Sequence, residues 1–168
     1  MPRVRLWFYN PSQDTSGWLN KVVSRLDPPY CHCELQFADD VACSIYMGTA
    51  AGMRRRSFDV SSYDCVEVPC TAQEHAAMYA TAAAIVAHEV QFSTLRMTGC
   101  MLWMPVSDNE RFTFCSKLCV DILQSAQVLP APVEPGKTTP SGLHRLLARM
   151  PPRAPPAPVG PCMALDFK

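Results

Sequence analysis

Cys115 lies where the sequence changes from a loop to a helix, a position at which a thiol can act as a nucleophile. It follows Thr113 and Phe114 in the segment FTFCSKLCVDIL. The free backbone N–H groups and the positive dipole end of a helix stabilise a thiolate and can hold an oxyanion. Cys119, one turn later, would lie deeper in the helix, so we assign it to the core. A buried structural cysteine is the alternative interpretation of Cys115 itself.

His32 is the histidine that fits best as the base for this thiol. A nucleophilic thiol needs a base within hydrogen-bond reach, and the base needs an acceptor that orients its ring. In the segment YCHCELQF, strand alternation places His32, Glu34 and Gln36 on the same face. His32 and Glu34 are therefore a chemically sensible pair, although a structural histidine on a strand is the alternative. The remaining histidines fit less well because they lie on predicted helices: His75, His88 and His144.

The elements that must position these residues follow from the apolar pattern. Period-two runs predict strands at 4–9, 31–37, 41–47 and 64–68. The second and third would form a hairpin around Ala38-Asp39-Asp40, a turn without the glycine that the tightest hairpins prefer. Helical spacing predicts helices over 15–26, 71–88, 112–124 and 139–147. Thr71 and Glu74 fit a capping box at the start of the second helix.

Length and charge limit the architecture and the partners. The chain has 168 residues with 48% hydrophobic content, enough for one domain, which we expect over 1–150. Residues 151–168 begin PPRAPPAPVGP and are expected to form a flexible proline-rich tail. Lys and Arg number 15, as do Asp and Glu, so no basic field for nucleic acid is expected. The run Arg54-Arg55-Arg56 is interpreted as solvated charges on a loop or strand edge.

Cysteine usage favours a cytoplasmic protein with reduced thiols. Nine cysteines in irregular spacing, with no apolar leader at the N-terminus, fit an intracellular setting. No window reaches the roughly 18 apolar residues of a membrane span, and we expect a monomer. A zinc-binding module is an alternative, since enough ligands are present: Cys31, Cys33, Cys65, Cys70, Cys115, Cys119 and the histidines. Structural zinc sites, however, favour C-x2-C pairs in turns. We therefore expect neither a metal nor a cofactor.

The order of these motifs resembles a known family. PYCHCELQF, CSIYMGT, GMRRRSF, FTFCSKLCVDIL and TTPSGLHRLL, in this order, resemble the circularly permuted branch of the NlpC-type papain-like cysteine hydrolases. Bacterial, phage and poxvirus members of this branch read approximately S-H-V-E-L early and Y-C-S-E-L late. Their histidine precedes their cysteine, as His32 precedes Cys115 here. The resemblance covers about residues 4–147 and implies an α+β fold, with a small antiparallel sheet packed against the nucleophile helix.

The resemblance also implies an activity. It would be that of a thiol hydrolase or acyltransferase, such as a viral peptidase or amidase in the host cytoplasm, which cleaves an amide or ester bond through a cysteine acyl-enzyme. Substrates would be peptides, amides or lipid esters. A catalytically inactive viral binding protein of the same fold is the alternative.

Individual residues can be matched to the family's site. Cys115 matches the nucleophile, His32 the base and Glu34 the third catalytic residue. Ser44, where related families carry His or Glu, is the alternative third member. Tyr30 is a further candidate, for the oxyanion site. Two residues depart from the family's motifs. Lys117 stands where the family has an acidic residue, and Cys33 stands where it has an aliphatic one.

Overall fold

A five-stranded antiparallel sheet lies at the centre of the computed structural model. The structure describes residues 2–11, 25–102, 104, 111–130 and 132–151. Its strand order is β4-β3-β2-β1-β5. The strands are β1 (Arg3–Tyr9), β2 (His32–Gln36), β3 (Val41–Ser44), β4 (Gly52–Arg55) and β5 (Tyr63–Pro69). The α-helices are α2 (Ala72–Ala87), α3 (Thr94–Met101), α4 (Cys115–Ser125) and α5 (Pro140–Arg149). The expected α+β class is confirmed.

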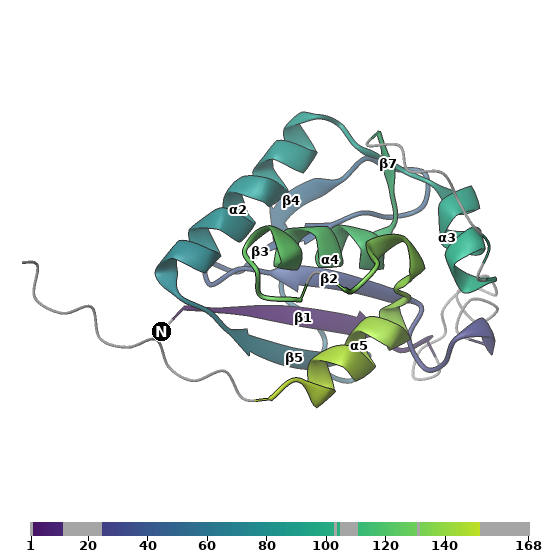
Figure 1. Ribbon diagram of the computed structural model, residues 1–168, viewed down its shortest axis with the longest axis horizontal. Helices are drawn as coiled ribbons and strands as arrows, with labels where there is room; N and C mark the ends of the chain where they lie inside the picture. Colours follow the sequence, from purple (N-terminus) through teal and green to yellow (C-terminus); the bar gives the residue numbers. More distant parts are fainter. Residues whose placement is uncertain (1, 12–24, 103, 105–110, 131, 152–168) are drawn as a thin grey trace, which may run out of the picture.

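The core lies between this sheet and the helices that cover one of its faces. Helices α2, α4 and α5 lie over that face (Figure 1). Alternation along β1 sends Val4, Leu6 and Phe8 into the core, where they are fully buried. Leu118 and Ile122 of α4 belong to the same apolar cluster. Burial of this cluster holds α4 against β2, the two elements that carry the predicted nucleophile and base.

The predicted hairpin forms between β2 and β3. Leu35 pairs with Cys43 in an antiparallel register, and the four residues 37–40 connect the strands. Asp40 closes the loop with φ of 62°, a left-handed conformation that aspartate tolerates better than most residues. The Phe37 N–H donates to the Val41 carbonyl at 2.9 Å. The loop therefore turns without the glycine that the tightest turns use.

Helix α4 begins later than the sequence pattern predicts. Phe112 and Thr113 form strand β7 (Phe112–Thr113), which pairs in parallel with β6 (Gln91–Phe92). The Ser93 N–H donates to the Thr113 carbonyl at 2.8 Å. The prediction of a helix over 112–124 was wrong at its start, because this pairing keeps the first residues extended. Cys115 becomes the first residue of the helix.

The capping box at the start of α2 is confirmed. Thr71 Oγ1 accepts the Glu74 N–H at 3.1 Å, and the Glu74 carboxylate accepts the Thr71 N–H at 2.7 Å. Thr139 caps α5 in a similar way, by accepting the Gly142 N–H at 3.0 Å. These caps satisfy N–H groups that a helix start leaves without partners.

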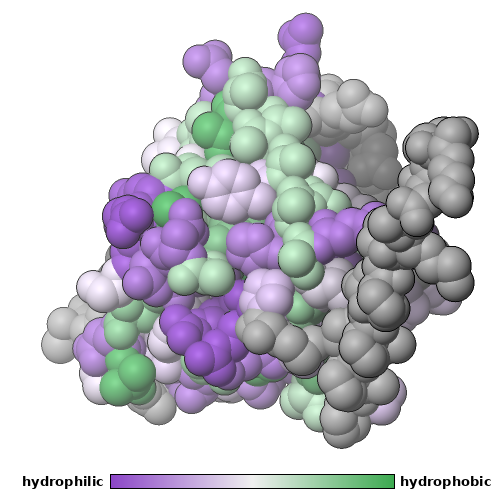
Figure 2. Space-filling model, turned by 90° about the vertical axis from the view of Figure 1, so that its left-hand side faces the viewer, coloured by the Kyte–Doolittle hydropathy of each residue, from purple (hydrophilic) through white to green (hydrophobic). Residues whose placement is uncertain are grey.

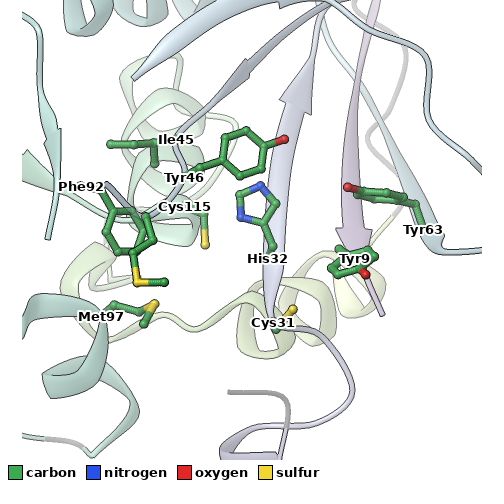
Figure 3. Close-up of a pocket in the computed structure, with 10 residues that line it drawn as sticks. Tyr9, Cys31, His32, Ile45, Tyr46, Tyr63, Phe92, Met97 and Cys115 are labelled. Carbon is green, nitrogen blue, oxygen red and sulfur yellow. The ribbon is translucent and has the colours of Figure 1, made fainter. Parts of the chain in front are cut away.

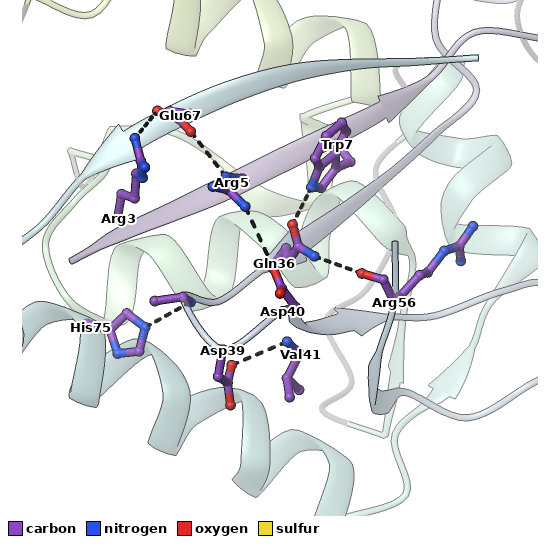
Figure 4. A network of polar contacts seen from close by, with 11 residues as sticks. Arg3, Arg5, Trp7, Gln36, Asp39, Asp40, Val41, Arg56, Glu67 and His75 are labelled. Carbon is purple, nitrogen blue, oxygen red and sulfur yellow. Dashed lines mark hydrogen bonds and ion pairs between the residues drawn. The ribbon is translucent and has the colours of Figure 1, made fainter. Parts of the chain in front are cut away.

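The sheet face opposite the helices carries a polar network (Figure 4). Arg3 and Arg5 of β1 both pair with Glu67 of the neighbouring strand β5. Trp7 Nε1 donates to Gln36 Oε1 at 2.8 Å, and Gln36 in turn donates to the Arg56 carbonyl at 2.8 Å. These hydrogen bonds tie the segment that follows β4 onto β1 and β2, so this face is partly covered.

Some expected elements lie outside the described residues, and some described elements were not predicted. Of the helix expected over 15–26, only residues 25 and 26 are described, and they are helical. Of the expected tail at 151–168, only residue 151 is described. Strand β4, strand β6 and helix α3 had no predicted counterpart. Their short runs carry weak periodic signals.

Among the described residues, no helix combines the length and apolar character needed to cross a bilayer. The face shown in Figure 2 mixes hydrophilic and weakly hydrophobic residues, and strongly hydrophobic residues appear there only in small spots. This face therefore shows no broad apolar patch.

Candidate active site

Cys115 occupies the first helical position of α4, at a helix start that no side chain caps. The preceding residue, Phe114, is extended, with φ of −143° and ψ of 168°. The first helical hydrogen bond runs from the Leu118 N–H to the Phe114 carbonyl at 2.9 Å. The backbone N–H groups before Leu118 thus have no partner within the helix. They and the helix dipole favour a negative charge at the Cys115 sulfur or beside it.

His32, the first residue of β2, lines one pocket together with Cys115 (Figure 3). The pocket has a volume of about 240 Å³. The described residues that line it are Tyr9, Cys31, His32, Ile45, Tyr46, Met47, Tyr63, Phe92, Met97 and Cys115. The structure thus brings the predicted nucleophile and the predicted base together at a concave site, although 83 residues separate them in the sequence (115 − 32 = 83).

The electrostatics of the pair favour a thiolate and an imidazolium. Burial alone would lower the pKa of His32, but hydrogen bonding to Cys115 and attraction to the charges of Cys115 and Glu34 outweigh it and raise this pKa from 6.5 to about 10. The pKa of Cys115 lies well below its usual value of 9.0. The largest cause is a hydrogen bond from the Cys33 thiol, and hydrogen bonding and attraction to His32 add to it. Both shifts stabilise the same ion pair.

Cys33 reaches Cys115 because β2 is only partly paired with β3. The ladder between these strands joins Leu35 and Gln36 to β3 and leaves the start of β2 open on that side. The Cys33 N–H and thiol can therefore both donate to the Cys115 sulfur. Cys33 is fully buried, and its Sγ also lies 3.8 Å from the Sγ of Cys119. This contact confirms the assignment of Cys119 to the core.

Other described thiols are shifted in the opposite direction from Cys115. Burial is the main cause of a raised pKa at each of them: Cys31, Cys33, Cys43, Cys65 and Cys100. The pKa rises to about 12 at Cys31, where the nearby Cys115 charge adds to the effect of burial. Cys115 therefore differs from these thiols in its ionisation, and not only in its position.

Glu34 lies behind His32, as the strand alternation predicted, and it is fully buried. Its Oε1 lies 3.5 Å from His32 Nε2. Because Nε2 is directed at Glu34, Nδ1 is the ring nitrogen that faces the Cys115 thiol. His32 Nε2 and Glu34 Oε2 are buried without a hydrogen-bond partner, and the Oγ of Ser116 is a third such atom. The contact between His32 and Glu34 is longer than an ordinary hydrogen bond.

Arg56 and Tyr46 hold the Glu34 carboxylate, and sequence reasoning missed both. Arg56 Nη1 lies 2.8 Å from Glu34 Oε1, and the Tyr46 hydroxyl donates to the same oxygen at 2.6 Å. Arg56 Nη1 also contacts the Tyr46 hydroxyl. The Tyr46 ring stacks on His32, with ring centres 4.7 Å apart. The positions of these residues in the sequence gave no local signal of this arrangement.

The interpretation of the arginine run as solvated charges is wrong for its last member. Arg54 and Arg55 are exposed, but Arg56 is half-buried. Its guanidinium lies over the Phe58 ring at 4.8 Å, and its Nη2 donates to the Tyr63 hydroxyl at 2.9 Å. The chain turns here so that this one cation meets the buried Glu34 carboxylate, which would otherwise carry an unpaired buried charge.

Two other predicted site residues lie apart from the His32–Cys115 pair. Ser44 is buried on β3 but makes no hydrogen bond with His32 among the described contacts. Tyr30 does not line the pocket, because its hydroxyl donates to Asp64 at 2.6 Å and its ring packs on His144. The described contacts of Tyr30 give no support to the suggested role in the oxyanion site. The Tyr46 ring, which follows β3 in the sequence, stacks on His32 instead.

The remaining histidines do not line the pocket. His88 is exposed at the end of α2. His75 is half-buried, because its ring packs edge-on against Phe37 at 5.4 Å. His144 packs against Phe8 and Tyr30. Burial lowers the pKa of His144, which fits a neutral ring in this setting.

The comparisons with known proteins gave no relative. No family model, no curated protein and no solved structure matches this chain. Among the described residues, no group of three or more His, Cys, Asp or Glu side chains is arranged to hold a metal ion. Any statement of function must therefore be argued from the residues of this site.

Proposed function

We propose that this protein is a cysteine hydrolase or acyltransferase in which Cys115 is the nucleophile and His32 the base. The observation that carries the proposal is the meeting of Cys115, at an uncapped helix start, with His32 at one pocket. The opposite pKa shifts of the two side chains support it. The thiolate is the reactive form of cysteine, so a site that stabilises it is prepared for attack on a carbonyl.

The chemistry is acyl transfer in two steps. The Cys115 thiolate attacks the carbonyl carbon of an amide or ester. The bond to the leaving group breaks as imidazolium His32 gives its proton to the leaving nitrogen or oxygen. Water, an amine or an alcohol then attacks the thioester and gives a proton to His32, and cleavage of the C–S bond restores the thiolate. The N–H groups at the start of α4 would hold the oxyanion of each tetrahedral intermediate.

Glu34 serves as the third member of this site and acts by orienting His32. Its carboxylate also pairs with Arg56 and accepts a hydrogen bond from Tyr46. Positive and negative groups therefore alternate in the series Arg56, Glu34, His32 and Cys115. Alternating charges offset the cost of placing each ion in a buried site. Glu34 would thus fix the ring and support the imidazolium without taking its proton.

The order of these residues supports a permuted papain-like hydrolase. A strand carries the histidine, and a later helix start carries the cysteine, the order of the family that the motifs resemble. Peptidase, amidase and lipid acyltransferase activities all fit the same residues, because the fold alone does not select a substrate. A cytoplasmic, viral setting is part of this proposal and rests on the motifs and on the reduced thiols.

An acyl-trapping experiment tests the proposal against that of an inactive binding protein. The purified protein is treated with a panel of activated thioesters, and the acylated residue is located by intact-mass and peptide mass spectrometry. We expect one acyl group on Cys115, which is absent in Cys115→Ser and retained in Cys65→Ser, which removes an exposed thiol. Absence of acylation across the panel would favour the inactive binding protein.

A further inference from the structure

The pocket beside Cys115 has two chemically different halves, and they lie on opposite sides of the reacting pair (Figure 3). On the Cys115 side the wall consists of aliphatic, thioether and phenyl groups from Ile45, Phe92 and Met97. On the His32 side it carries the phenol rings of Tyr9 and Tyr63. None of the described lining residues is an Asp, Glu, Lys or Arg.

The direction of proton transfer decides which half receives which part of the substrate. His32 must reach the leaving group to protonate it, so the leaving group lies on the His32 side. The acyl group extends from the carbonyl in the other direction, toward the half formed by Ile45, Phe92 and Met97. Entry of a charged acyl group there would remove its hydration and offer no ion pair in return.

Arg96, which neighbours this half on α3, contacts the backbone and not the pocket. Arg96 precedes Met97 on α3, is buried, and directs Nη1 toward the Phe112 carbonyl at 3.4 Å. It is not among the residues that line the pocket. The volume of about 240 Å³ lies below the roughly 300–1,000 Å³ of sites for whole small molecules. The two halves together therefore have room only for small groups.

We infer that the acyl group transferred by this site is uncharged and apolar, and that Met97 helps to select it. This inference rests on the proposed function, since it assigns the two sides of the same reaction. It separates the candidate substrates by their chemistry. Acyl groups with an aliphatic or thioether chain fit the half beside Cys115, and acyl groups that carry a carboxylate do not.

A pair of thioesters matched in chain length tests this inference. S-hexanoyl- and S-adipoyl-N-acetylcysteamine each offer six acyl carbons and share an uncharged leaving group, but the adipoyl chain ends in a carboxylate. The measurement is the rate of Cys115 acylation by intact-mass spectrometry. We expect the hexanoyl thioester to react about tenfold faster or more, since a pocket without a partner for a charge disfavours it by more than one methylene would.

A charge placed in the pocket should reverse part of this preference. Met97→Lys, at a half-buried position, should lower the hexanoyl-to-adipoyl rate ratio about fivefold or more by pairing with the carboxylate. Leu95→Lys is the matched control, because it adds the same charge to α3 at a side chain that is 77% exposed and does not line the pocket. Met47→Lys, at an exposed lining position, is the second variant if Met97→Lys does not fold.

The possible outcomes separate the two proposals. Equal rates for the two thioesters, or a ratio that neither lining variant lowers more than Leu95→Lys does, would overturn the inference while leaving Cys115 as nucleophile. Failure of both thioesters to acylate Cys115 in the unmodified protein would count against the proposed function itself. A high ratio that falls only in the lining variants supports the inference.

Discussion

At the scale of single residues, the site depends on how four side chains share charge. Arg56 and Glu34 form an ion pair at 2.8 Å, and His32 lies between Glu34 and the Cys115 thiol. Because Glu34 is fully buried, its charge needs both neighbours. The ionisation of Cys115 is therefore linked to a residue, Arg56, that does not reach the pocket wall.

Loss of Arg56 should impair both stability and turnover. Arg56→Gln leaves Glu34 with one fewer charged partner, and we expect a loss of about 3 kcal/mol in the free energy of unfolding, measured by urea denaturation. The rate of Cys115 acylation should fall with it, because the ring of His32 loses its fixed support. Arg56→Lys should recover part of the stability and part of the acylation rate. Arg55→Gln, at an exposed neighbouring position, should change neither the stability nor the rate. Equal effects of Arg55→Gln and Arg56→Gln would contradict the assigned role of Arg56.

The raised pKa of His32 predicts a difference between two pH profiles. Turnover of an amide needs imidazolium His32 to protonate the leaving nitrogen, so it should fall as the pH rises through about 10, the pKa of His32. Alkylation of Cys115 by iodoacetamide needs no acid and should not fall in that range. Both are measured from pH 6 to 11 on the same preparation. An alkaline decline of turnover near pH 6.5 would show that His32 titrates as a free histidine.

At the scale of elements, two boundaries position the chemistry. The pairing of β6 with β7 keeps Phe112 and Thr113 extended, and α4 then begins at Cys115. The pairing of β2 with β3 is absent at the start of β2, and this leaves the Cys33 N–H free to meet the thiolate. Both boundaries result from where strand pairing begins or ends, and neither depends on the helix propensity of the segment.

The cap of α2 offers a test of stability that should leave the chemistry unchanged. Thr71→Ala removes the acceptor for the Glu74 N–H, and we expect a loss of about 1 kcal/mol in the free energy of unfolding, by urea denaturation. Thr71→Ser keeps the hydroxyl and should lose much less. The rate of Cys115 acylation should be the same in both. A similar loss in both variants would mean that packing of the Thr71 methyl group, and not the cap, stabilises the helix start.

At the scale of the whole molecule, the sequence predicts the local features of the site better than its distant ones. His32 and Glu34 could be paired because two residues on one strand share a face. Cys115 could be predicted as the nucleophile because a loop precedes its helix. Arg56, Tyr46 and the wall residue Met97 could not be assigned, because tertiary structure brings them to the site: Arg56 from the segment after β4, Tyr46 from the segment after β3 and Met97 from the unpredicted α3.

The expected boundary between domain and tail can be tested on the whole chain. Residues 151–168 are proline-rich and show no apolar periodicity, so their removal should leave the melting temperature of the domain unchanged. The check is differential scanning calorimetry on the full chain and on a chain that ends at residue 150. A drop of several degrees in the shortened chain would show that these residues stabilise the domain.

The most direct test of the central claim is the ionisation of Cys115. Iodoacetamide labelling at about pH 6, followed by peptide mapping, should mark Cys115 while Cys65, which is exposed but has a raised pKa, stays unlabelled. In His32→Ala the labelling of Cys115 should shift to more alkaline pH, toward the ~8.5 of a free thiol. Label spread evenly over several cysteines at this pH, or a Cys115 profile that His32→Ala leaves unchanged, would contradict the thiolate–imidazolium pair.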